Sequence, residues 1–185
     1  MALIAITAGD DGTVLQPNLA FTTPTITGGT INGTTMTGSI SNAVKRCTTQ
    51  TDATSNTTLA DITGLTGISL VAGATYAYEI RLSGTAGASG GWKVAFNYTT
   101  ATLTSLQSQS VAFSAAAVVT GTQVTTTTTQ TSLIASTAAH LAGIIYGTLV
   151  VNAAGTLAVQ FAQNASNATA SSIYVGSTAS FTRIS

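Results

Sequence analysis

Residues 25–39 form three consecutive five-residue repeats with an apolar residue at each second place and Gly at each fourth. The repeats read TITGG, TINGT and TMTGS, so their apolar positions are Ile26, Ile31 and Met36. Side chains alternate between the two faces of a strand, so this odd spacing keeps one side apolar only if the chain bends at the glycines. Three such short units cannot cover one another as a solenoid does. We therefore expect the segment to wind around the same segment of other copies, as an oligomeric, fibrous element.

Charged residues are scarce in the rest of the chain as well. Five Lys/Arg and five Asp/Glu make up 5% of the 185 residues, against about 25% in an ordinary globular protein. The chain is 44% hydrophobic and has no net charge, which is the opposite of a disordered composition. Thr alone supplies 38 residues, and Thr, Val, Ile and Tyr favour strands. The composition predicts an all-β protein.

The same composition bounds the possible partners. Nucleic acid and anionic lipid both need clustered Lys/Arg, so we expect no nucleic acid and no membrane as partners. The single Cys47 excludes an intrachain disulfide and a thiolate metal site, and we expect no cofactor. Residues 1–6 are apolar but lack the basic region and the length of a signal peptide. No apolar run approaches the roughly 20 residues of a membrane span.

The chain divides into three predicted parts. Residues 1–24 are an extended N-terminal arm with a turn signal at Gly9–Gly12, and residues 25–47 hold the repeats and a linker with Lys45 and Arg46. Residues 48–185 are predicted to form one domain.

Short strand signals recur throughout that domain. Tyr76, Tyr78, Ile80 and Leu82 alternate with more polar residues, as in a half-buried antiparallel strand. Residues 83–91 are predicted to be a loop, and residues 143–151 and 156–163 a hairpin joined through 152–155. Residues 132–141 are the only helix candidate. About eight closely spaced strands favour an antiparallel β-sandwich, like a jelly roll.

The chain offers few residues for catalysis. His140 is the sole histidine, so a multi-histidine metal site is excluded, and a structural or interface role competes with a Ser-His dyad. The Asp10-Asp11-Gly12 run lacks the spacing of a calcium loop and fits a turn better. Asp52, Asp61 and Glu79 lie in separate segments, and a glycosidase carboxylate pair would have to form in three dimensions. We expect no catalytic residues, no metal site and no enzyme.

Other polar and aromatic residues have a structural and a functional interpretation. Glu79 and Arg81 are two residues apart on one strand face, a spacing that favours partners on a neighbouring strand or subunit. Trp92 could form a sugar-stacking platform with three tyrosines, although a role in the core or in an interface is the more common explanation. Five Asn-X-Ser/Thr sequons arise from the high Thr content.

Four stretches of the sequence resemble segments of known structural proteins. Residues 56–65 (NTTLADITGL), 70–82 (LVAGATYAYEIRL) and 155–166 (GTLAVQFAQNAS) resemble a β-sandwich domain common in structural proteins of tailed bacteriophages. Residues 25–33 (TITGGTING) resemble the short β-prism segments of phage fibres and spikes. The resemblance does not extend to the first 24 residues. It implies a homotrimer on the virion surface, with no catalytic residues to carry over.

The expected function is therefore a homotrimeric capsid decoration (cement) or head-fibre protein, made in the bacterial host cytoplasm and located on the phage particle. The arm would bind the major capsid protein or another virion protein through Leu3, Ile4, Ile6, Val14, Leu15 and Leu19. The expected trimer-axis contacts are Ile26, Ile31, Met36 and Ile40. A tail fibre or receptor-binding tip that recognises a host-surface glycan is the alternative. A glycan depolymerase is a third interpretation.

Overall fold

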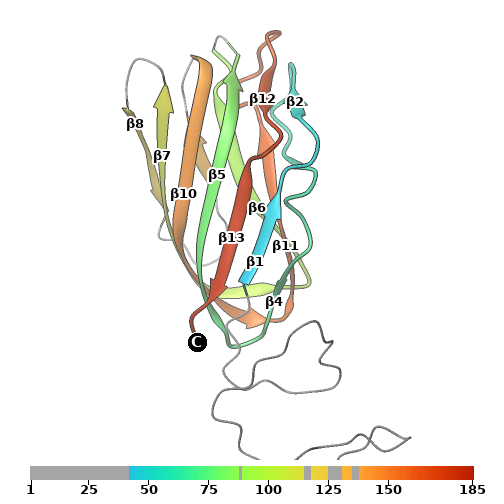
Figure 1. Ribbon diagram of the computed structural model, residues 1–185, viewed down its shortest axis with the longest axis vertical. Helices are drawn as coiled ribbons and strands as arrows, with labels where there is room; N and C mark the ends of the chain where they lie inside the picture. The colour runs from blue at the N-terminus through green and yellow to red at the C-terminus, as the bar shows by residue number, and fades with distance from the viewer. Residues whose placement is uncertain (1–41, 88, 115–117, 125–130, 135–137) are drawn as a thin grey trace, which may run out of the picture. The chain divides into compact units, whose positions relative to one another are not determined.

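A computed structural model describes residues 42–87, 89–114, 118–124, 131–134 and 138–185. These residues form strands and connections, and no helix occurs among them (Figure 1). The thirteen strands are β1 (Asn42–Arg46), β2 (Thr51–Ala53), β3 (Ala60–Asp61), β4 (Ile68–Leu70), β5 (Thr75–Ala86), β6 (Trp92–Thr99), β7 (Thr102–Ser114), β8 (Val118–Val124), β9 (Thr131–Ile134), β10 (Ala138–Ala153), β11 (Gly155–Ala162), β12 (Ser171–Ile173) and β13 (Thr178–Arg183). The prediction of an all-β protein is confirmed.

The strands form two antiparallel sheets that face each other as a sandwich. The larger, eight-stranded sheet has the order β1-β13-β5-β10-β7-β8, and β12 joins it by pairing with both β2 and β5. The smaller, five-stranded sheet has the order β3-β11-β6-β9, with β4 also paired to β11. Figure 1 shows the larger sheet in front and β6 and β11 behind it. The predicted antiparallel β-sandwich is confirmed.

The strand pairs are nested along the chain. β1 pairs with β13 and β2 with β12, β3 and β4 both pair with β11, β5 pairs with β10, and β6 pairs with β9. Strand β6 also pairs with β11. A long antiparallel hairpin that rolls into two sheets gives this nested order, which is the jelly-roll arrangement. The antiparallel pair β7 and β8 is inserted between β6 and β9, and it widens the larger sheet beside β10.

The core lies between the sheets, because each long strand alternates apolar and polar residues. In β5 the side chains of Tyr76, Tyr78, Ile80 and Leu82 are buried, while the residues between them face outward, as the sequence predicts. Aromatic rings occupy the centre: the Tyr78 ring stacks on Phe181 at 5.4 Å between centroids. The aliphatic residues from both sheets complete one continuous cluster.

Two sequence-based boundaries change in the structure. Asn42–Arg46, expected in the linker, form β1 and pair along their whole length with β13, so Lys45 and Arg46 are strand residues. The sandwich therefore begins before residue 48. Ser83–Ala86, expected in a loop, continue β5 and pair with β10 and β12. Ser/Gly composition indicates a flexible loop only where no neighbouring strand supplies hydrogen-bond partners.

The predicted hairpin of residues 143–163 is wrong, although both of its strands exist. β10 belongs to the larger sheet, where β5 and β7 occupy its two edges, and β11 pairs in the smaller sheet. The connection is a corner between sheets. At Gly155 a Cβ atom would lie 2.2 Å from the Ala101 nitrogen and 2.4 Å from the Thr99 oxygen. Only glycine lets the chain pass this close to the β6–β7 turn.

The helix candidate at residues 132–141 is also wrong where the structure describes it. Thr131–Ile134 form β9, and residues from Ala138 onward form β10. Residues 135–137 lie outside the described part of the chain.

Candidate functional surface

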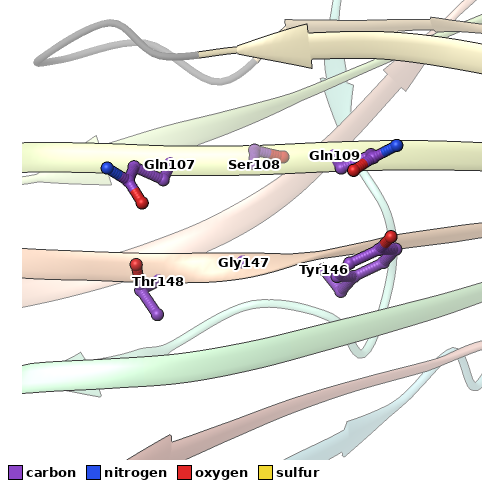
Figure 2. Close-up of a pocket in the computed structure, with 6 residues that line it drawn as sticks. All are labelled: Gln107, Ser108, Gln109, Tyr146, Gly147 and Thr148. Carbon is purple, nitrogen blue, oxygen red and sulfur yellow. The ribbon is translucent and has the colours of Figure 1, made fainter.

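The outer face of the larger sheet carries a shallow hollow between β7 and β10. Its volume is about 190 Å³, and its lining residues are Gln107, Ser108, Gln109, Tyr146, Gly147 and Thr148. Figure 2 shows Gln107 and Gln109 on one strand, with Thr148 and Tyr146 on the strand beside it. The strand register places Tyr146 opposite Gln109 and Thr148 opposite Gln107. Two amides, an aromatic ring and a hydroxyl therefore line one concave patch.

These side chains point outward because strand residues alternate faces. Within β10, Ile145 and Leu149 are fully buried, whereas the intervening Tyr146 is 42% exposed and Thr148 is also exposed. Within β7, Leu106 and Ser108 are buried, and Gln107 and Gln109 are exposed. The lining side chains that face solvent are uncharged.

Gly147 and Tyr78 form the support beneath this hollow. A Cβ atom at Gly147 would lie 1.9 Å from the Gln107 carbonyl oxygen and 2.9 Å from the Tyr78 hydroxyl oxygen. The Tyr78 hydroxyl donates a hydrogen bond of 3.2 Å to that same carbonyl. Burial raises the pKa of Tyr78 to about 12, with the Ser108 hydroxyl partly offsetting the effect. The hydroxyl therefore stays protonated at neutral pH and links β5 to the β7 backbone beneath Gly147.

Further exposed apolar groups share the outer face. Phe113, on β7, is 38% exposed, and Ile144 and Val111 are partly exposed. Ile144 lies directly opposite Val111 in the β7–β10 ladder. The hollow thus lies beside an apolar strip on a sheet face with few charges.

Glu79 and Arg81 are the charged residues nearest to Tyr146 on this face. Glu79 pairs with Tyr146 and Arg81 with Ile144 in the β5–β10 register. Within this chain their partner is not a neighbouring strand, because the Arg81 guanidinium donates to the Glu79 carboxylate directly. Pairing with another subunit stays a prediction. The contact with Glu79 raises the pKa of Arg81. The Arg81 side chain is 68% exposed and the Glu79 side chain 43%, so the ion pair adds little stability.

A set of loops joined by hydrogen bonds lies at the end of the sandwich where β12 pairs with β2 and β5. The Gln163 side chain is completely buried there. Its Oε1 accepts hydrogen bonds from the backbone nitrogens of Asn56 and Asn167, at 3.2 and 3.0 Å. Its Nε2 donates to the carbonyl oxygens of Asn167 and Thr169, at 3.0 and 2.8 Å. One amide therefore joins the loop after β2 to the loop before β12.

Ser171 joins a third loop to the same end. Its hydroxyl accepts a hydrogen bond from the Gly87 nitrogen at 2.9 Å and donates to the Gly91 carbonyl at 3.0 Å. The Ala165 nitrogen also donates to the Gly90 carbonyl at 2.9 Å. We call this set of loops (residues 54–59, 87–91 and 163–170, without residue 88) the Gln163 tip.

The acidic residues proposed as a carboxylate pair have separate partners. Asp52, on β2, accepts from the Gln50 amide at 2.8 Å, and Asp61, on β3 in the smaller sheet, accepts from the Gln160 amide at 2.8 Å. Glu79 is bound to Arg81. Within the described residues no group of three or more His, Cys, Asp and Glu side chains could hold a metal ion.

The aromatic residues considered as a sugar platform belong mostly to the core. Trp92 is fully buried and its Nε1 donates to the Thr85 carbonyl at 2.7 Å. Tyr76 and Tyr78 are buried, and Tyr98 packs against the core. The platform of Trp92 and tyrosines is therefore wrong. The exposed tyrosine is Tyr146, which lies on the opposite, solvent-facing side of the larger sheet from these rings.

Cys47 is buried at the end of β1. Its thiol donates to the Thr49 carbonyl at 3.1 Å. Burial raises the pKa of the Cys47 thiol, and this hydrogen bond partly offsets the shift. Cys47 is thus a buried, hydrogen-bonded member of the core cluster.

Most of the predicted binding residues lie outside the described part of the chain. This applies to the arm residues Leu3, Ile4, Ile6, Val14, Leu15 and Leu19 and to the axis residues Ile26, Ile31, Met36 and Ile40. His140 belongs to β10, but the structure describes only its backbone and not its side chain. Both predicted contact sets stay predictions.

The hollow itself was missed by sequence reasoning. One cue was Tyr146, a large polar aromatic residue at an outward position between buried Ile145 and Gly147. The other was the pair Gln107 and Gln109, two amides at successive outward positions of β7. Recognising it requires the β7–β10 register, because Gln107 and Tyr146 are far apart in the sequence.

The described part of the chain contains no helical segment that could span a lipid bilayer. Comparison of the chain with protein-family models, with curated proteins and with solved structures gives no match.

Proposed function

We propose that this protein is a structural protein of a tailed-bacteriophage particle: a homotrimeric capsid decoration (cement) or head-fibre protein that binds the particle through its N-terminal region. Its partners are two further copies of the chain and the major capsid protein or another virion protein. It is made in the host cytoplasm and acts on the particle surface, without catalysis.

The observation that supports this proposal best is the position at which the chain enters the sandwich. Asn42, the first residue of β1, pairs with Thr182 near the C-terminus, and the Thr75 nitrogen at the start of β5 donates to the Ser185 carbonyl at 3.1 Å. The Gln163 tip lies at the other end of β5, where Gly84 and Thr85 pair with β12. The described chain therefore enters the sandwich at one end, at Asn42, and the tied loops lie at the other. This polarity suits an anchored subunit with a projecting domain.

The jelly-roll sandwich also agrees with the fold that the sequence resemblance implies. Low charge suits a subunit that works in an assembly, because a surface with a net charge near zero tends to associate. The absence of basic clusters in the sequence argues against nucleic acid as the partner.

Deletion of residues 2–23 tests the proposed anchor. The truncated protein should keep the trimer mass in light scattering, because the repeats and the sandwich remain, but should lose binding to particles stripped of the native protein. The full-length protein and full-length Phe113→Ala are controls, and both should occupy the particles normally. Normal occupancy by the truncated protein would place the anchor on the sandwich, and a monomer mass for the full chain would remove the trimer from the proposal.

A tail fibre or receptor-binding tip is the second candidate, and the hollow beside Tyr146 is the observation that favours it. Cryo-electron microscopy of intact particles distinguishes the two, since density over the capsomers supports decoration and density at the tail supports the fibre.

A further inference from the structure

We propose that the hollow over Gly147 binds one ring of a neutral carbohydrate. Tyr146 would contact the apolar face of the ring, and Gln107, Gln109 and Thr148 would bind its hydroxyls. The site lies within the folded sandwich, so this inference holds whether or not the protein belongs to a virion.

The chemistry of the lining selects this ligand class. A pyranose ring has a C–H face without hydrogen-bonding groups and a rim of hydroxyls that both donate and accept. Tyr146, with 42% of its surface exposed, offers an aromatic face for the first. For the rim of hydroxyls, each glutamine amide offers two hydrogen-bond donors and an acceptor, and the Thr148 hydroxyl adds one donor and one acceptor. The hollow thus places an aromatic side chain and three polar side chains on two adjacent strands (Figure 2).

Charged ligands fit the hollow less well. Its lining holds no Lys, Arg, Asp or Glu. The adjacent Glu79 and Arg81 neutralise each other in a direct ion pair. A phosphate, a sulfate or a sialic acid carboxylate would therefore lose water without gaining an opposite charge, which is unfavourable.

The size of the hollow sets the expected length of the ligand contact. Its volume of about 190 Å³ is below the roughly 300–1,000 Å³ of pockets that enclose a drug-sized ligand. It suits one ring of a longer chain, with the rest of the chain in solvent or along the sheet. A single small contact gives weak binding, with a Kd in the millimolar range, and several copies presented together would raise the apparent affinity.

The hollow lies on a backbone that is hydrogen-bonded on both sides. β10 is paired on both edges, with β5 and with β7. The Tyr78 hydroxyl fixes the Gln107 carbonyl from the core side, and Gly147 allows the two backbones to approach closely. Outward side chains on this framework keep their spacing, so little ordering of the backbone opposes binding.

Binding by the full-length protein to an array of neutral and sialylated oligosaccharides is the first measurement. We expect binding to neutral oligosaccharides. Tyr146→Ala should weaken it by about two- to tenfold, which corresponds to the loss of one aromatic contact. Phe113→Ala, which removes another exposed aromatic ring from the same face outside the hollow, should leave binding unchanged. Because Tyr146 faces outward and loses only cross-strand contacts, its variant should melt within about 4 °C of the wild type.

A titration followed by NMR locates the ligand. The free form of the best-bound neutral oligosaccharide should shift the side-chain amide signals of Gln107 and Gln109, while the signals of Gln160 and Gln163 stay in place. Absence of glycan binding by the wild-type protein would overturn the proposal. So would binding that Tyr146→Ala leaves intact, or binding restricted to sialylated glycans.

Discussion

Gln163→Leu is the substitution with the most direct prediction, because one buried side chain makes four hydrogen bonds to backbone groups. Leu has a similar volume and no polar atoms, so it leaves the nitrogens of Asn56 and Asn167 and the carbonyls of Asn167 and Thr169 without this partner. Each lost bond costs about 0.5–1.5 kcal/mol, and a group left buried without a partner costs about 1–3 kcal/mol.

The four bonds together predict a loss of about 4 kcal/mol in the free energy of unfolding. We use about 1 kcal/mol for each bond, since the partners lie at the rim of the sandwich, where water can replace part of the loss. For a chain of this length, 1 kcal/mol corresponds to about 2–4 °C in melting temperature. The expected decrease is therefore roughly 10 °C.

Chemical denaturation at fixed protein concentration measures this change, because the stability of an oligomer depends on concentration. Gln160→Leu is the matched control: its amide makes one hydrogen bond, to Asp61 at the surface, and the change should stay within about 0.5 kcal/mol. Amide hydrogen exchange should report faster opening at Asn56 and Asn167 in the Gln163 variant than in the control. Equal stability of the two variants would refute the claim that Gln163 holds the tip together.

Two further changes test the support beneath the hollow. Gly147→Ala should lower the free energy of unfolding in a denaturant titration by about 3 kcal/mol, the upper end of the usual cost of overpacking, because its Cβ would collide with the Gln107 carbonyl. Gly73→Ala, at a φ of 74° but with no atom within 4 Å, should lower it by only about 1–2 kcal/mol. A larger loss of stability in Gly73→Ala than in Gly147→Ala would contradict the close packing at Gly147. Stability should also fall as the pH rises from 10 to about 12, because the folded chain keeps the Tyr78 proton over a range in which the unfolded chain releases it. The free energy of unfolding, measured by denaturant titration at several pH values in this range, should fall less with pH in Tyr78→Phe than in the wild type. Identical pH profiles would show that Tyr78 is not the group responsible.

The sequence by itself determined the class of the fold and much of the core. The scarcity of charge and the abundance of Thr and Val predict strands, and the alternation in residues 76–82 identified which side chains of β5 are buried. These features are local, because the two faces of a strand follow from the pleat alone. The assignment of Trp92, Tyr76 and Tyr78 to a core was similarly accessible from residue type, and the structure buries all three.

The tertiary structure alone decided which strands pair. Residues 143–151 and 156–163 have the spacing of a hairpin, but β10 and β11 lie in different sheets because β5 and β7 already occupy both edges of β10. In the same way, Ser83–Ala86 have a loop composition and become strand because β10 and β12 supply their partners. A chain segment does not encode whether a distant strand will reach it.

The candidate site depends entirely on such long-range pairing. Gln107 and Gln109 come near Tyr146 only through the β7–β10 register, and a shift of one residue would turn these side chains into the core. Gln163 likewise acts only because the loop after β2 folds against it. Sequence patterns report what each strand presents on its two faces, and packing between the sheets decides which of those faces meet.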